Sequence, residues 1–144
     1  ARCMKVEAFF FIFAATDTMG KLNVLGAFDR IFLKSAPGVY QNCTVAMRVR
    51  FVRSEMGSHP FEIRFVDQDG RDIMKPLSGE VDVSFRPETH TGAMNFVLNI
   101  VRLRFEYFGE YQVDLRIDDE VMASLPLVVC EASPGSASRG RGTQ

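Results

Sequence analysis

Three aspartates, Asp67, Asp69 and Asp72, surround Gly70 and offer the carboxylate oxygens that calcium prefers. An EF-hand loop would also need a bidentate glutamate farther along the chain and a helix on each side, and the sequence around residue 70 supplies neither. The same Asp-x-Asp-Gly string is typical of a hairpin turn. We therefore predict no metal site and no cofactor.

His59 and His90 are the candidates for acid–base catalysis, because imidazole titrates near neutral pH. Each lies in an expected loop, and the neighbouring serines and threonines show no nucleophile elbow. Cys43 lies on the apolar face of an expected strand, where a thiol is normally buried and unreactive. We predict no catalytic residues and expect that the protein is not an enzyme.

Arginine is the one polar residue type with any concentration. Arg48 and Arg50 project from one face of an expected strand, and Arg64 follows on a strand that would bring it across from them. Guanidinium groups bind phosphates and carboxylates, so this cluster would suit an anionic ligand or nucleic acid. Glu62 and Asp114 share the same outward positions, which favours a surface of mixed charge. Anion or nucleic-acid binding through the three arginines is therefore the alternative function.

The overall composition argues against a nucleic-acid-binding protein, a disulfide-stabilised protein and a membrane protein. Among 144 residues, 17 are lysine or arginine and 18 are aspartate or glutamate, so the strong positive field of a nucleic-acid-binding protein is absent. Three scattered cysteines indicate reduced thiols rather than a disulfide framework. The apolar segment 8–15 is far shorter than the roughly 20 residues of a membrane span. We predict a cytoplasmic protein that has no membrane partner.

The elements that must position these residues are strands. Apolar and polar residues alternate with period two in runs that begin at residues 43, 61, 81, 111 and 123. Eight or nine such strands with turn sequences between them predict an all-β fold, an antiparallel two-sheet β-sandwich of Greek-key or immunoglobulin-like type. We expect one domain over residues 4–131 and a disordered tail over residues 132–144. The alternation places the following residues in the core: Val45, Met47, Val49, Phe51, Phe61, Ile63, Phe65, Val113, Leu115, Leu125 and Leu127.

The first strand does not follow this simple pattern, because it is apolar on both faces. Phe9, Phe11 and Phe13 share one face, and the residues between them are apolar as well. If one face packs on the core, the second needs a cover, either a loop such as residues 35–42 or a second copy of the protein. We name Phe9, Phe11 and Phe13 as the possible self-association residues.

Two further irregularities have structural interpretations. The apolar positions change parity between Ile100 and Leu103, which predicts a bulge or bend near Val101 and Arg102. The string Gly-Glu-Tyr that ends at Tyr111 predicts a strand-entry corner, in which the tyrosine hydroxyl bonds back to a nearby backbone group.

Five strings carry a resemblance to known proteins: Met4-Lys5-Val6-Glu7-Ala8, Ala14-Ala15-Thr16-Asp17, Gly20-Lys21-Leu22-Asn23-Val24-Leu25-Gly26-Ala27-Phe28-Asp29, Asp67-Gln68-Asp69-Gly70 and Asn95-Phe96-Val97-Leu98-Asn99. Together they resemble an uncharacterised bacterial family of short β-sandwich proteins, a domain of unknown function, over residues 4–129. The resemblance implies a bacterial origin and a fold class, and it implies no site residues. We predict a non-catalytic interaction or structural module that binds a protein partner or itself.

Overall fold

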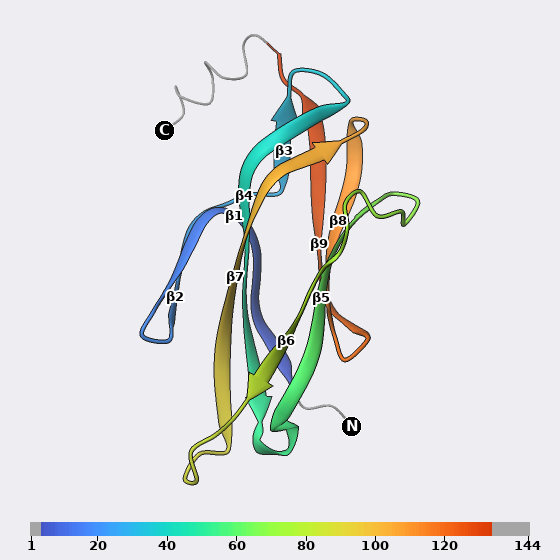
Figure 1. Ribbon diagram of the computed structural model, residues 1–144. Coiled ribbons are helices and arrows are strands. Elements are labelled where there is room, and N and C mark those ends of the chain that lie inside the picture. Colours follow the sequence, from blue (N-terminus) through green and yellow to red (C-terminus); the bar gives the residue numbers. More distant parts are fainter. Residues whose placement is uncertain (1–3, 134–144) are drawn as a thin grey trace.

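The computed structural model describes residues 4–133 and is built of nine β-strands and one short 3-10 helix (Figure 1). The predicted tail therefore lies outside the described residues, apart from Ala132 and Ser133. No helix between residues 4 and 133 is long and apolar enough to cross a membrane. The elements are β1 (Lys5–Thr18), β2 (Lys21–Ala27), β3 (Arg30–Leu33), β4 (Gly38–Val52), η1 (Arg53–Glu55), β5 (Gly57–Asp67), β6 (Leu77–Val83), β7 (Thr91–Phe105), β8 (Gly109–Ile117) and β9 (Glu120–Glu131).

The strands form two sheets, which Figure 1 shows nearly edge-on. The first sheet has the order β2-β1-β4-β7 and the second has the order β3-β9-β8-β5-β6. All neighbours are antiparallel except β3 and β9, which run parallel. The predicted all-β, two-sheet architecture is confirmed.

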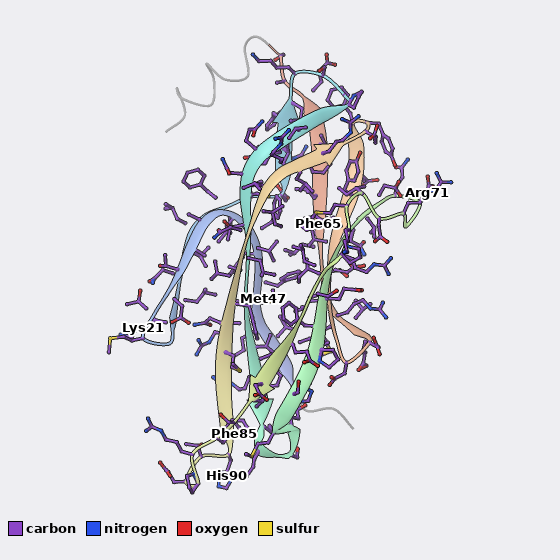
Figure 2. All side chains as sticks on the ribbon, in the orientation of Figure 1. Lys21, Met47, Phe65, Arg71, Phe85 and His90 are labelled. Carbon is purple, nitrogen blue, oxygen red and sulfur yellow. The ribbon has the colours of Figure 1, made fainter. Side chains whose placement is uncertain are left out.

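Alternation places the core between the sheets. Met47 on β4 and Phe65 on β5 point into this space from opposite sides (Figure 2) and are each 1% exposed. Nine of the eleven predicted core residues are buried, while Phe61 and Leu125 are half-buried and pack against the others. The period-two assignment of faces is therefore correct for these strands.

A second, smaller apolar layer lies on the outer face of the first sheet. Ile12 on β1 and Ala46 on β4 point away from the central core, yet both are 0% exposed. After residue 12 the β1–β2 hairpin leaves β4 and stands off this outer face (Figure 1), and its tip at Gly20 accepts a hydrogen bond from Arg48. The expected loop over residues 35–42 is not the cover, because β4 already begins at Gly38. The tip of the β1–β2 hairpin instead lies against β4 and β7 on this outer face, where Gly20 and Asp17 bond to Arg48 and Asn95.

Both predicted irregularities are present. Arg102 has φ +59°, in the left-handed region, and the apolar residues change face across it. The pairing does not slip there, since Asn42 faces Val101 and Tyr40 faces Leu103, so β4 and β7 bend together. The Tyr111 hydroxyl donates to the carbonyl oxygen of Tyr107 at 2.7 Å, which confirms the tyrosine corner at the start of β8.

Candidate functional site: an uncharged sheet edge

Strand β7 ends the first sheet and has one free side. Its fifteen residues pair with β4 on one side, from Thr91 facing Val52 to Phe105 facing Gly38. On the other side no strand within residues 4–133 pairs with it. Such an edge exposes a row of unpaired backbone N–H and C=O groups, which form a template for another strand.

The composition of this edge distinguishes it from the other sheet edges. Residues 91–101 contain no charged residue and no proline. By contrast, β6 carries Glu80 and Asp82, β2 begins with Lys21, and β3 has only four residues and begins with Arg30. Charges and short length are the usual protection of an edge against unwanted pairing. Strand β7 is long, and its first eleven residues carry no charge, so it lacks both kinds of protection.

The alternation of the antiparallel ladder identifies the free backbone groups. Arg53 donates its backbone N–H to the carbonyl oxygen of His90 at 2.9 Å, in the same register as the β4–β7 pairing. Hydrogen-bonded and non-bonded pairs alternate in such a ladder, so even-numbered residues of β7 bond to β4. The N–H and C=O groups of Ala93, Asn95, Val97 and Asn99 therefore point to the free side.

The outer face of β7 is fixed by side-chain hydrogen bonds. The Asn95 amide donates to Asp17 Oδ2 at 2.8 Å and to the Gly20 carbonyl at 3.1 Å, and its oxygen accepts from Arg48 at 2.9 Å. The bond from Asn95 is the main reason why the pKa of Asp17 lies below its usual value. These contacts hold the hairpin tip against β7 and fix the edge strand from its outer side.

The three arginines expected to form an anion site are not brought together. Arg48 and Arg50 both donate to Glu7, at 3.1 and 2.5 Å, and the bond from Arg50 lowers the pKa of that carboxyl. Arg64 lies in the second sheet and pairs with Asp72 at 2.8 Å. Each guanidinium is therefore hydrogen-bonded to a carboxylate on its own sheet or on the adjoining loop, Glu7 being shared by Arg48 and Arg50, and the three arginines do not form one cluster.

The expected association surface on the first strand is not formed either. Phe9 and Phe11 are 9% and 3% exposed, because they point between the sheets. Phe13 is 66% exposed, because the hairpin leaves the sheet at this point. It lines a groove of about 550 Å³ together with Phe32, which is 53% exposed, and the first residues of β4. Exposed apolar surface thus lies beside the start of β4, where the free β7 strand bends at Arg102.

His59 and Cys43, two of the groups considered for catalysis, are each constrained by their surroundings. Nδ1 of His59 lies 2.8 Å from Oδ2 of Asp118, and Nε2 lies 2.5 Å from the carbonyl oxygen of Glu55. Both partners accept, so the ring donates from both nitrogens and has none left to act as a base. Burial raises the pKa of the Cys43 thiol to about 12, which keeps it protonated and unreactive.

The loop that contains Asp67, Asp69 and Asp72 is held by hydrogen bonds from its own backbone to an aspartate side chain. One carboxylate oxygen of Asp67 accepts the N–H groups of Asp69 and Arg71, at 2.9 and 3.0 Å, and Gly70 takes φ +79°. Asp72 is turned toward Arg64. Across residues 4–133 no three histidine, cysteine or acidic side chains are grouped to hold a metal ion. The loop forms the predicted turn after β5, and the next strand, β6, begins at Leu77.

A model of a family of unknown function, DUF6941, matches residues 7–130. The chain belongs to this family. The resemblance to an uncharacterised domain seen in the sequence is therefore confirmed. No curated protein matches the sequence.

Several solved structures are similar in fold at low identity. A β-glucosidase from Listeria innocua matches with a TM-score of 0.50 at 8% identity, covering 87% of this chain and 16% of its own. An alkylpurine DNA glycosylase from Pseudomonas fluorescens matches with a TM-score of 0.45 at 11% identity, covering 90% and 31%. An immunoglobulin-like protein from Pseudomonas aeruginosa matches with a TM-score of 0.39 at 9% identity, covering 88% and 95%. The chain thus spans less than a third of either of the first two proteins, and the similarity concerns the fold alone.

Sequence reasoning did not identify the β7 edge. The signal was present as eleven consecutive uncharged residues without proline, starting at Thr91. Alternation alone does not show which strand ends a sheet, because an edge strand and a central strand can carry the same apolar pattern on the core face. The edge became visible only through the strand order.

Proposed function

We propose that this protein is a non-catalytic interaction module that associates with itself. The observation that carries the proposal is the free, uncharged side of β7, which continues into exposed apolar surface at Val101, 66% exposed. This surface continues into the groove that Phe13 and Phe32 line, because Val101 faces Asn42, which also lines that groove. Contiguous apolar surface beside an open edge is a feature of proteins that bind other proteins.

We also propose that the two sheets form an immunoglobulin-like Greek-key sandwich. Three features support this topology. The chain crosses between the sheets at β2–β3, β3–β4, β4–β5, β6–β7 and β7–β8. The short β3 strand runs parallel to the last strand, and the Tyr111 corner opens the penultimate one. Such sandwiches serve widely as binding modules, an analogy of fold that names no partner.

We further propose a cytoplasmic location. The support is the cysteine usage: Cys43 and Cys130 are free thiols, as is usual where the compartment keeps thiols reduced.

Sedimentation velocity of the full chain, from about 1 to 500 μM, tests the proposed self-association. We expect the mean sedimentation coefficient to rise with concentration toward that of a dimer, because mass action drives association. A coefficient that stays at the monomer value over the whole range would overturn self-association.

A further inference from the structure

We propose that two copies of this chain join by antiparallel pairing of β7 with β7, with Val97 of each copy opposite the other. This inference rests on the proposed self-association and names the surface that carries it. The paired sheet would have the order β2-β1-β4-β7-β7-β4-β1-β2 across the two copies. The dimer is isologous, because the same strand contributes from both sides.

The unpaired backbone groups define which residues bond across the edge. Ala93, Asn95, Val97 and Asn99 present their N–H and C=O groups to the free side, so odd-numbered residues of one copy bond odd-numbered residues of the other. With Val97 on the two-fold axis, Asn95 faces Asn99 and Ala93 faces Val101. This register places the two asparagines opposite each other and covers the exposed Val101 side chain with a small residue.

The core-facing side chains of β7 fit the same register. Met94, Phe96 and Leu98 point toward the central core, yet all three are only half-buried, because no strand of the described part of the chain lies beyond them on the free side. Pairing through Val97 sets Phe96 of one copy against Leu98 of the other and Met94 against Ile100. Cross-strand aromatic and aliphatic pairs stabilise sheets. A second copy would therefore cover surface that the single chain leaves partly open.

Charge favours a second copy as the occupant. Like charges directly opposite each other destabilise strand pairs, so most strands are poor partners for themselves in an antiparallel register. Residues 91–101 carry no charge, and the first charged residue after them, Arg102, would face the partner's Gly92. The edge is thus self-complementary over its whole uncharged length.

A single proline substitution tests the pairing. Val97→Pro removes an N–H that points to the free side and leaves the β4 ladder intact, because proline is tolerated at the edge of a sheet. Val97→Thr is the matched control, since it keeps both the N–H and the shape of the side chain. We expect Val97→Pro to raise the dimer dissociation constant at least about tenfold in sedimentation velocity, and Val97→Thr to leave it within about twofold. Circular dichroism confirms that each variant is folded.

Crosslinking tests the register without proline. In a Cys3→Ser, Cys130→Ser background, Val97→Cys places two thiols on residues whose Cα atoms are about 5.5 Å apart across the axis. Val101→Cys on the same face is the control, because its two copies lie eight residues apart along the strand, about 27 Å. We expect a short bismaleimide to link the Val97→Cys chains and not the Val101→Cys chains.

The outcomes separate this inference from the proposed function. If the wild type associates and Val97→Pro associates equally well while folded, the β7 pairing is wrong and self-association stands. If Val101→Cys crosslinks and Val97→Cys does not, the register is wrong even if Val97→Pro is too unstable to analyse. A wild type that stays monomeric overturns both proposals.

Discussion

Nδ1 of His59 donates to Oδ2 of Asp118 over 2.8 Å, and this contact ties the start of β5 to the turn between β8 and β9. The turn itself has two residues in the left-handed region, Asp118 and Asp119, at φ +53° and +64°. The ring stacks on Phe51, with centroids 5.8 Å apart. The imidazole thus joins the end of β4 and the start of β5 to the β8–β9 turn, which lies 59 residues farther along the chain.

Because of the contacts of His59, we predict that the free energy of unfolding depends on pH. The hydrogen bond to the Glu55 carbonyl, followed by the bond and charge of Asp118, raises the pKa of His59 above its usual value. A raised pKa in the folded state contributes stability that is fully present below about pH 6.5 and is lost as the pH rises through the folded value. We expect His59→Gln to lower the free energy of unfolding by about 1.5 to 3 kcal/mol at pH 5, the usual worth of bonds to a charged group, and by less at pH 9.

Thermal unfolding of the wild type, His59→Gln and His90→Gln between pH 5 and pH 9 measures this effect. His90→Gln is the control, because it removes the other imidazole of the chain. An equal gap between wild type and His59→Gln at both ends of the range would contradict the charged state assigned to His59.

Ile63 tests the centre of the core. It lies in the middle of β5 and is 0% exposed. Ile63→Ala removes buried methyl groups and leaves a cavity, so we expect a loss of about 2 to 5 kcal/mol in the free energy of unfolding. Val121→Ala is the control on an apolar residue that is 49% exposed, and it should change stability by less than about 1 kcal/mol. Urea titrations of both variants give the comparison, and an unchanged midpoint for Ile63→Ala would contradict the core assignment.

Asn95 tests how the hairpin is held. Asn95→Ala removes the bonds to Asp17, Gly20 and Arg48, so the tip of the β1–β2 hairpin should open more often than the two sheets unfold. We expect the backbone amides of β2 to exchange with deuterium faster in the variant, while those of β5 and β8 keep their wild-type rates. Equal acceleration in all strands would show that the hairpin is not an independent unit.

From the contacts of the aspartate loop we predict that calcium does not change the stability of the protein. One oxygen of Asp67 already accepts two backbone N–H groups, and Asp72 is paired with Arg64. Any ligand that binds only the native state raises the melting temperature. We expect the same melting temperature with millimolar calcium and with a chelator, and a rise with calcium would assign the loop to a metal.

Local pattern predicted most strands, the bend at Arg102 and the Tyr111 corner, because each depends on neighbours in the sequence. It did not predict the contacts of Arg48 and Arg50, since their partner Glu7 lies about forty residues away and reaches them only through the β1–β4 pairing. The cover over Ile12 was missed for a related reason. Its apolar character suggested a cover by a loop or a second copy, but only the bend of the chain after residue 12 shows that the β1–β2 hairpin lies against the same outer face.

The parallel pairing of β3 with β9 has a mechanical consequence. β1 begins at Lys5 beside Arg50, near one end of the molecule, and β9 ends at Glu131 beside Leu33, near the other (Figure 1). A force that pulls these two ends apart runs along both strands. The hydrogen bonds of β1 with β4 and of β9 with β3 and β8 then lie across the force and are loaded together in shear. The hydrogen bonds at both ends must break as a group rather than one after another, so the fold resists stretching along this axis more strongly than it resists peeling from a single strand.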